Sequence, residues 1–423
     1  MVARNMVARE VVPATDAPAG GHRRRAATID LRTRGEQRRP AGARTGARSD
    51  APVRLRPRPH AGRGTFTLLV LLLSVLNLVG LVMVLSASSV VSIHQYGSPW
   101  HYFERQVLWL LFGCVAFFVA LRTDRRWWRR FARPAMAISV LALFAVLVPH
   151  VGRSASGASR WLGTSSFQVQ PSELAKLTLI LFAADVLDRR AARGERGDWR
   201  YQMGPVLAVT GLLAALVLAQ PDMGTTVVIV AISLAMLCTA GMPGRPLAAL
   251  LAFGAVGGGL MAVAAPYRWR RLTAFLHPFR NASNTGFQSV QGLLALGAGR
   301  LTGDGIGSSL ASWGYLPNAP TDFIFAVIGE ETGLVGTLLM SGLFLALAVV
   351  GVRIACGARD RFSGLMAAGV TAWLIGQAVI NIGAVVGLLP VTGVPLPFVS
   401  FGGSSLVLTL FAAGMLGNIA RQP

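Results

Sequence analysis

Three groups of ionisable side chains stand inside or beside long apolar runs of this sequence, where charge is costly. Glu173 and Lys176 lie three residues apart at the start of one run, so on a helix they share a face and can pair. Glu330 and Glu331 lie inside another run, and Asp322 stands where that run begins. A charge at the centre of a membrane helix costs about 2.5–3.5 kcal/mol on insertion scales, so these residues are candidates for function.

Lys176 is the only lysine of a chain that has 40 Lys and Arg residues together. A sequence so biased towards arginine favours a requirement at this position for a compact or titratable ammonium. The structural alternative is an ion pair with Glu173 at the membrane interface, in which both side chains reach towards water.

Asp322 ends a long loop and begins an apolar run, in the order Thr321-Asp322-Phe323. Aspartate is a favoured N-cap, because its carboxylate accepts hydrogen bonds from free amides and faces the positive end of the helix dipole. The sequence alone therefore favours a capping role. A capped carboxylate would also stay ionised and fixed at the membrane surface, as a general base requires.

For Glu330 and Glu331 the structural alternative is pairing with arginine or backbone groups inside the bundle.

The elements that must carry these residues are helices that cross a membrane. The chain is 53% hydrophobic and 14% charged, whereas soluble domains carry about 25% charged residues. Apolar runs of about 18 residues or more mark membrane helices, so a soluble multidomain protein is excluded. We predict an all-α polytopic membrane protein with about ten transmembrane helices, at residues 65–88, 104–121, 133–150, 171–188, 203–220, 224–241, 247–265, 323–353, 362–387 and 402–420.

Arginine-rich segments between these runs predict the topology, because short basic loops stay in the cytoplasm. With ten spans, the basic segments all fall on one side of the membrane, which makes both termini cytoplasmic. These segments are the stretch before the first run, 122–133, 189–200 and 353–361. The extracytoplasmic segments are then 89–103, 151–170, 221–223, 266–322 and 388–401.

Two segments stand apart from the spans. Residues 1–63 hold 15 Arg against 5 acidic residues and almost no aromatic ones, so we predict a disordered cytoplasmic tail before a ten-helix membrane domain at 64–423. Its charge suits anionic lipids or acidic partners better than nucleic acid.

Residues 266–322 are predicted to form a large ordered extracytoplasmic loop between spans 7 and 8. Its arginines would contact lipid phosphates or form an anion site for a phosphorylated substrate: Arg268, Arg270, Arg271, Arg280 and Arg300.

Several motifs, in this order, resemble the SEDS family of FtsW, RodA and SpoVE proteins. They are Gly157–Trp161, Gln170–Glu173, Gln220–Thr225, Gly303–Ser309, Tyr315–Pro317, Thr321–Glu331, Gly387–Gly393 and Leu396–Ser405. The resemblance covers roughly residues 65–420. Within the family, the block Arg270–Pro278 followed by Gln288 and Gln291 is most similar to FtsW, the division member.

The resemblance implies a peptidoglycan glycosyltransferase that polymerises lipid II into glycan strands on the outer face of the cytoplasmic membrane, at the division septum. The family works with a class B penicillin-binding protein and other divisome proteins. Contacts with membrane lipids are expected, and none with nucleic acid. The catalytic Asp of the family maps onto Asp322, as general base or as ligand of Mg²⁺ or Mn²⁺. No organic cofactor is expected.

Transfer from a lipid diphosphate needs a base for the attacking hydroxyl, cations for the leaving diphosphate and a groove for the lipid. One carboxylate can suffice, because a diphosphate leaves without being protonated. The predicted substrate-binding residues are Arg160, Glu173, Lys176, Gln288, Gln291, Ser309, Ser404 and Ser405. The predicted polar residues of the bundle are Asp222, Glu330 and Glu331.

The sequence departs from the family pattern at Ser312, where Lys is frequent, at Pro320, where His is frequent, and at Phe401, where Tyr is common. The Ser312 departure removes a cation near the expected site. Four alternatives stand beside the polymerase hypothesis: a lipid II flippase, a non-catalytic scaffold that activates a class B penicillin-binding protein, an elongation role of the RodA type, and a secondary ion-coupled transporter, for which the sequence lacks a clear internal repeat.

Overall fold

The computed structural model describes residues 63–149, 152–155, 158–163, 168–192, 199–264, 269, 273–282 and 286–422. The predicted arginine-rich tail lies outside these ranges apart from Arg63. Three of the loop arginines, Arg268, Arg270 and Arg271, also lie outside the described residues.

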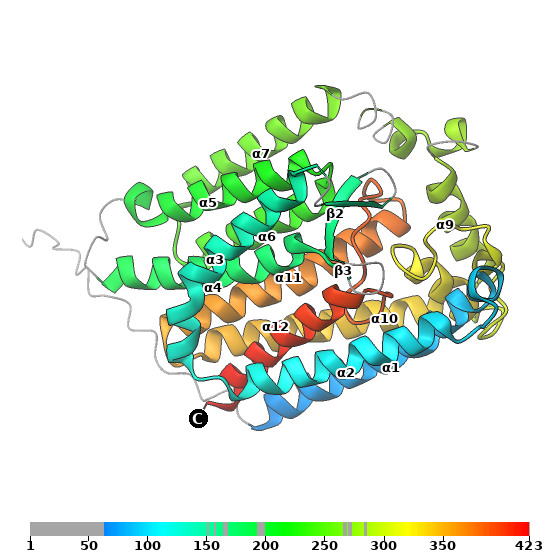
Figure 1. Ribbon diagram of the computed structural model, residues 1–423, viewed down its shortest axis with the longest axis horizontal. Helices are drawn as coiled ribbons and strands as arrows, with labels where there is room; N and C mark the ends of the chain where they lie inside the picture. Colours follow the sequence, from blue (N-terminus) through cyan, green and yellow to red (C-terminus); the bar gives the residue numbers. More distant parts are fainter. Residues whose placement is uncertain are drawn as a thin grey trace, which may run out of the picture. The chain divides into compact units, whose positions relative to one another are not determined.

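Ten long helices make up most of the described chain, at the positions where apolar runs predict them (Figure 1). They are α1 (Arg63–Tyr96), α2 (His101–Arg122), α3 (Arg125–Leu147), α4 (Pro171–Ala192), α5 (Trp199–Ala219), α6 (Met223–Thr239), α7 (Gly244–Ala264), α10 (Ile324–Gly357), α11 (Arg361–Val385) and α12 (Gly403–Arg421). The long loop contains helix α9 (Phe287–Ala298) and the 3-10 turns η1 (Pro278–Asn281) and η2 (Leu310–Trp313). Seven of the described helices are long and apolar enough to cross a membrane, so the chain is a polytopic helical membrane protein.

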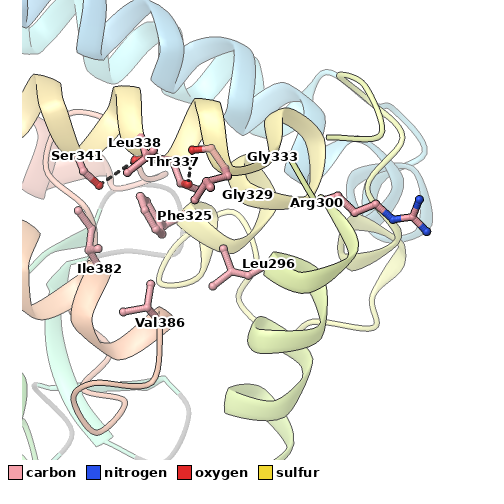
Figure 2. Close-up of a pocket in the computed structure, with 11 residues that line it drawn as sticks. Leu296, Arg300, Phe325, Gly329, Gly333, Thr337, Leu338, Ser341, Ile382 and Val386 are labelled. Atoms are coloured by element: carbon pink, nitrogen blue, oxygen red, sulfur yellow. Dashed lines mark hydrogen bonds between the residues drawn. The ribbon is translucent and has the colours of Figure 1, made fainter. Parts of the chain in front are cut away.

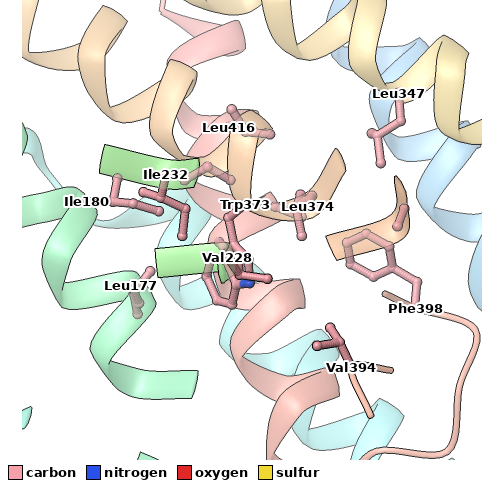
Figure 3. Close-up of a cluster of buried hydrophobic side chains, with 14 of the residues drawn as sticks. Leu177, Ile180, Val228, Ile232, Leu347, Trp373, Leu374, Val394, Phe398 and Leu416 are labelled. Atoms are coloured by element: carbon pink, nitrogen blue, oxygen red, sulfur yellow. The ribbon is translucent and has the colours of Figure 1, made fainter. Parts of the chain in front are cut away.

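Helix α4 is a central helix and not a lipid-facing one. It packs against α3, α5, α6 and α11, and most of its residues are buried, including the charged Glu173, Lys176 and Asp185. In the core, Leu177 and Ile180 of α4 lie close to α6 and to Trp373 of α11 (Figure 3). A charged helix can occupy this position only where its charges find partners inside the bundle.

A small antiparallel sheet stands in the segment 151–170, where an all-α fold is predicted. Strands β1 (Arg153–Ala155), β2 (Ala158–Gly163) and β3 (Gln168–Val169) pair in the order β1-β2-β3, with Leu162 opposite Val169. Strands this short give too few residues for an alternating pattern to be recognised in the sequence. The sheet brings Arg160 of β2 to the residues that precede α6, as described below.

Helix α10 is broken inside its apolar run, at Gly333, which adopts φ 66° and ψ −161°. The backbone groups freed by the break are bonded to the loop before it. The amides of Asp304 and Gly305 donate to the carbonyls of Glu330 and Glu331, at 3.1 and 3.0 Å. In return, Leu334 N donates to Arg300 O at 2.9 Å, and Val335 N donates to Leu301 O at 3.2 Å. The loop thus takes the place of one helical turn, where the sequence predicts a continuous span.

The two ends of the bundle differ in chemistry. The site end is the end at which α4, α6, α10 and α12 begin, and the arginine end is the end at which they finish. At the arginine end Arg125 pairs with Asp360 and Arg189 with Asp185, each at 2.7 Å, and Arg129 pairs with Asp188. These arginines belong to the segments that predict the cytoplasmic side.

Asp360 offers a test of the arginine end by pH. It is the N-cap of α11 and accepts hydrogen bonds from Ser363 N at 3.1 Å and Ser363 Oγ at 2.9 Å. Burial alone would raise the pKa of Asp360, but these hydrogen bonds and the Arg125 guanidinium outweigh it, so its pKa lies below the ordinary value. A depressed folded-state pKa stabilises the protein above the unfolded-state pKa of about 3.9, and this stability is lost as pH falls through the folded-state pKa.

We therefore expect Asp360→Asn to lower the unfolding free energy by about 0.3–1 kcal/mol at pH 7, because asparagine still caps the helix and only the charge that interacts with Arg125 and the helix dipole is lost. The difference between variant and wild type should disappear at the acid end of a thermal-unfolding series in detergent. Asp304→Asn, at an exposed carboxylate, is the control. A difference that stays constant from pH 7 down to the acid end would contradict the assignment.

Candidate active site

Asp322 lies in a tight turn directly before α10. Asn318 has φ 58°, a left-handed conformation that Asn tolerates, and its carbonyl accepts from the amides of Thr321, Asp322 and Phe323 at 3.1–3.3 Å. The N-cap position of α10 is occupied by Phe323. The predicted capping position of Asp322 is therefore wrong by one residue, because the Asn318 turn delays the start of the helix.

The backbone around Asp322 is held by α11 and by the chain that connects α11 to α12. Three consecutive carbonyls each accept one hydrogen bond: Pro320 O from Phe401 N at 2.9 Å, Thr321 O from Ser400 Oγ at 2.5 Å and Asp322 O from Asn381 Nδ2 at 2.8 Å. We call this arrangement the carbonyl clamp. It fixes the chain that carries the Asp322 carboxylate.

The Asp322 side chain is half-buried and lies beside Gly393. Gly393 is exposed and has φ 74°. A Cβ at this position would lie 3.5 Å from Asp322 Oδ2. Because Gly393 has no side chain, its backbone alone borders the carboxylate on this side, at the site end of the bundle.

The connection between α11 and α12 enters the bundle instead of passing over it. Its residues from Leu396 to Ser400 are buried, and Phe398 has φ 66°, which is strained for a bulky side chain. Gly80 of α1 packs so closely that a Cβ there would lie 2.6 Å from Phe398 O. Strain of this kind persists only where surrounding contacts fix the backbone.

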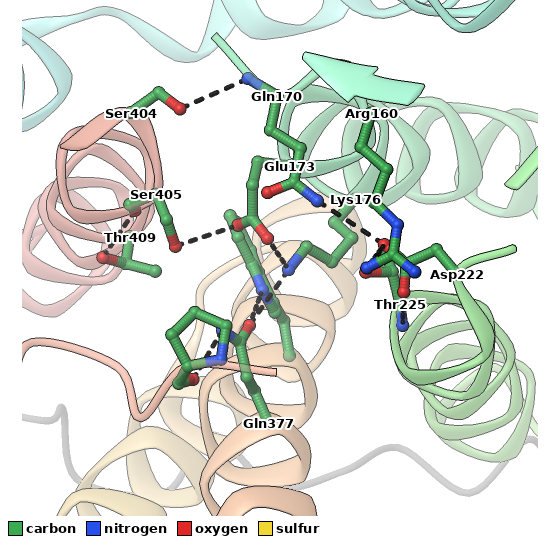
Figure 4. Close-up of polar contacts among 12 residues, drawn as sticks. Arg160, Gln170, Glu173, Lys176, Asp222, Thr225, Gln377, Ser404, Ser405 and Thr409 are labelled. Atoms are coloured by element: carbon green, nitrogen blue, oxygen red, sulfur yellow. Dashed lines mark hydrogen bonds and ion pairs between the residues drawn. The ribbon is translucent and has the colours of Figure 1, made fainter. Parts of the chain in front are cut away.

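The predicted pairing of Glu173 with Lys176 is confirmed, with 2.7 Å between Lys176 Nζ and Glu173 Oε1 (Figure 4). The same ammonium donates to Gln377 Oε1 at 3.0 Å and lies 5.0 Å from the centre of the Trp373 ring. Ser405 Oγ donates to the other carboxylate oxygen of Glu173 at 3.3 Å. The pair therefore joins α4 to α11 and α12.

Lys176 is 0% exposed, so in this conformation its ammonium is closed to a diphosphate. Contact between Lys176 and substrate stays a prediction. The arrangement itself supports a role in fixing the helices around the site, because a buried ammonium is stable only when paired and hydrogen-bonded.

Arg160 and Asp222 meet where the sheet approaches α6 (Figure 4). Asp222 is the N-cap of α6 and accepts from Thr225 N at 3.1 Å and Thr225 Oγ1 at 2.9 Å. Arg160 Nη1 lies 3.9 Å from Asp222 Oδ2, and Arg160 donates to the carbonyls of Gln220 and Pro221 at 3.3 and 2.5 Å. The Arg160 side chain keeps 25% of its surface exposed, so its guanidinium is accessible to an anion.

Glu330 and Glu331 bond to the loop and to α1. Glu330 accepts from the hydroxyl of Ser309 and from the amides of Leu310 and Ala311, at 2.9 and 3.2 Å for the amides. Glu331 accepts from the hydroxyl of Ser86 on α1. Pairing with backbone groups, the structural alternative for Glu330, is thus present, and Ser309 is fully buried against it.

The remaining predicted residues lie at the site end. Ser404, at the start of α12, accepts from Gln170 N at 3.3 Å, and Ser405 touches Glu173 as described above. Gln288 and Gln291 lie in the first turns of α9 and are half-buried. Their contact with substrate stays a prediction.

A cavity of about 320 Å³ lies between α9, α10 and α11 (Figure 2). Along α10 it is lined by small residues that recur every four positions: Gly329, Gly333, Thr337 and Ser341. Leu296, Phe325 and Ile382 supply its apolar walls. We call it the α10 groove. Small residues at this spacing are typical of helix faces that pack closely against another helix in a membrane.

Three residues that the sequence analysis does not single out prove central: Gln377, Asn381 and Ser400. Gln377 and Asn381 lie four residues apart on α11, and their amides donate to Pro395 O at 3.0 Å and Val394 O at 2.7 Å. Both are almost fully buried. Two amides at helical spacing in an apolar run are the signal that could have identified them, because buried amides need partners.

A divalent cation fits this site only as an ion shared with substrate. Among the described residues, no group of three or more His, Cys, Asp and Glu side chains lies close enough to hold a metal. Mg²⁺ is commonly held by one or two carboxylates together with substrate phosphates. The half-buried Asp322 carboxylate suits that use.

Sequence comparison finds a matching family model and similar proteins in other bacteria. The family model described as "Cell cycle protein", for FtsW, RodA and SpoVE, matches residues 66–423. A probable peptidoglycan glycosyltransferase FtsW of Mycobacterium tuberculosis is 42% identical over 388 residues, covering 90% of this chain and 74% of the relative. The stage V sporulation protein E of Bacillus subtilis is 38% identical over 354 residues, covering 84% and 96%.

Two solved structures share the fold. A peptidoglycan synthase complex that coordinates polymerization and crosslinking contains a chain with TM-score 0.67 and 29% identity, covering 83% of this chain and 96% of that one. The rod shape determining protein RodA of Thermus thermophilus aligns with TM-score 0.61 and 30% identity, covering 84% and 97%.

Proposed function

The chain belongs to the FtsW/RodA/SpoVE family, and on this premise we propose that it is a peptidoglycan glycosyltransferase of cell division. The relatives with the name FtsW are described as probable peptidoglycan glycosyltransferases, and they match most of this chain. We propose further that the substrate is lipid II, polymerised on the outer face of the cytoplasmic membrane at the division septum. The observation that carries the proposal is the half-buried Asp322 carboxylate, fixed by the carbonyl clamp beside exposed Gly393.

The proposed chemistry uses Asp322 as the base. Its carboxylate accepts the proton of a sugar hydroxyl as the hydroxyl oxygen attacks the anomeric carbon of a second lipid-linked saccharide. The bond from that carbon to the diphosphate breaks, and the lipid diphosphate leaves with the electron pair. Arg160, with its exposed guanidinium, is the described cation best placed to hold an anion near the start of α6.

As the alternative role of Asp322, we propose that its carboxylate would hold Mg²⁺ or Mn²⁺ together with the phosphates of the substrate. Such an ion would neutralise charge on the leaving diphosphate. Asp322 would supply the protein ligand, and the phosphate oxygens would supply others.

The proposed polymerase activity can be tested directly. The protein is purified in detergent with a class B penicillin-binding protein and given lipid II with Mg²⁺ or Mn²⁺, and glycan strands are resolved on a gel. Strand formation supports the polymerase. Headgroup transport across vesicles without strands would instead favour a lipid II flippase. Stimulation of crosslinking by the partner without strands would favour a scaffold, and rescue of an elongation defect alone would favour a role of the RodA type.

We also propose that the α10 groove receives the membrane helix of the class B penicillin-binding protein. Its small-residue face and apolar walls suit a packed helix. Other divisome proteins and membrane lipids would cover the remaining apolar surface.

Thr337→Leu should fill the groove and reduce recovery of the partner in co-purification by about tenfold, equivalent to about 1.4 kcal/mol of lost packing. Val335→Phe, which adds a similar volume at an exposed position of the same helix, is the matched control and should leave recovery unchanged. Equal recovery of the partner with both variants would place the partner elsewhere.

A further inference from the structure

Asn381 holds two chain segments with one side-chain amide. Its Nδ2 donates to Asp322 O at 2.8 Å and to Val394 O at 2.7 Å. The residue is 2% exposed. One amide group thus sets the spacing between the Asp322 turn and the segment that contains Gly393, which lies beside the Asp322 carboxylate.

The oxygen of this amide takes no part in the two donated bonds. Asn381 Oδ1 is buried and has no hydrogen-bond partner among the described residues. A buried carbonyl without a partner destabilises a fold. An apolar side chain of the same shape would avoid that cost but would remove the donor that the carbonyls of Asp322 and Val394 share, so the contribution of Asn381 lies in these two donated bonds.

Ser400 acts on the neighbouring peptide. Its hydroxyl donates to Thr321 O at 2.5 Å and accepts from Leu396 N at 2.8 Å. Ser400 is 4% exposed. Asn381 from α11 and Ser400 from the buried connection therefore approach consecutive carbonyls of the carbonyl clamp from different elements.

We propose that Asn381 and Ser400 are positioning residues for glycosyl transfer, which act by fixing the backbone of Asp322 and do not touch substrate. The proposal rests on the proposed function. A base must lie within hydrogen-bond reach of the proton it removes, and a displacement of about 1 Å can cost about a hundredfold in rate. Loosening the clamp should therefore lower kcat and leave substrate affinity almost unchanged.

The test replaces Asn381 by Leu, which removes both donated bonds and the partnerless oxygen and keeps the branched shape and the number of side-chain heavy atoms. We expect kcat for glycan polymerisation to fall by about ten- to a hundredfold, with KM for lipid II within about twofold of wild type. The unfolding temperature should fall, because the buried carbonyls of Asp322 and Val394 lose their shared donor, and removal of the partnerless oxygen offsets only part of that loss.

Asn418→Leu is the matched control. Asn418 also uses its Nδ2 to hold backbone carbonyls, those of Leu121 at 2.8 Å and Thr123 at 3.0 Å, but at the arginine end. This variant should lower the unfolding temperature and keep the wild-type kcat. A fall in kcat of the same size in both Asn variants would overturn the proposal, since it would reflect general loosening of the bundle.

Ser400→Ala is the second variant, and it tests the positioning role independently if the Asn381 variant does not fold. It should lower kcat by about tenfold with KM little changed. Wild-type kcat in folded Ser400→Ala would overturn the proposal. If the wild-type protein itself makes no glycan strands, the proposed function is refuted. If the wild type is active and the variants are equally active, the proposed function stands and the positioning role is refuted.

Discussion

Asp322→Asn abolishes glycan polymerisation and leaves the fold intact: this is the largest effect that the site predicts. Asparagine keeps the shape of the side chain, and the backbone carbonyl of residue 322 can still accept from Asn381. The variant loses the capacity to accept a proton and the negative charge that would hold a metal ion. Removal of a general base lowers rates by about 10²–10⁴-fold, which would leave no strand visible on a gel.

The measurement is the lipid II assay with the partner present, together with thermal unfolding and co-purification of each variant. Asp304→Asn is the control, because Asp304 lies in the same loop with an exposed side chain, and it should keep activity. Full activity in Asp322→Asn would remove Asp322 from the reaction. Loss of partner binding in this variant would move its role from chemistry to assembly.

Lys176→Met should give the largest loss of stability. The variant leaves the Glu173 carboxylate buried, with only Ser405 Oγ as a described donor at 3.3 Å. Both side chains of the pair are at most 3% exposed, so solvent does not screen the charge that remains. Removing one partner of a buried ion pair costs about 3–5 kcal/mol, and we expect a marked fall in unfolding temperature and in yield of folded protein.

The double variant Glu173→Gln with Lys176→Met separates charge from packing. With no buried charge left, most of the lost stability should return, because replacing both partners of a buried pair is often neutral. Arg353→Met, at an exposed cation of α10, is the control for loss of a positive charge. A single variant as stable as wild type would mean that the Glu173 carboxylate finds another partner or a proton at little cost.

The positions of the long helices and the Glu173–Lys176 pair could be predicted from sequence because they depend on local patterns. Apolar runs of membrane length and a spacing of three on a helix face are visible in one dimension. The bond partners of Lys176 on α11 were not predictable in this way. They depend on which helices become neighbours, and Gln377 lies 201 positions away along the chain.

The break at Gly333 and the carbonyl clamp could not be predicted for a related reason. Gly333 lies within an apolar run that fits an unbroken span, and only the loop near Arg300 and Asp304, which replaces the missing bonds, makes the break stable. Asp322 was recognisable as a residue at the start of a helix. Its exact cap position was not, since the turn at Asn318 delays the helix by backbone hydrogen bonds that leave no pattern in the sequence.

The burial of the single lysine has a practical consequence for labelling chemistry. Reagents that acylate primary amines find no lysine on the surface of the folded protein, because Lys176 is 0% exposed. Acylation of Lys176 then requires α4 and α11 to separate, so the acylation rate depends on how often the bundle opens locally. A reagent of this kind, followed by mass spectrometry of the peptide that contains residue 176, would report the dynamics of the membrane core at one atom, with no engineered probe.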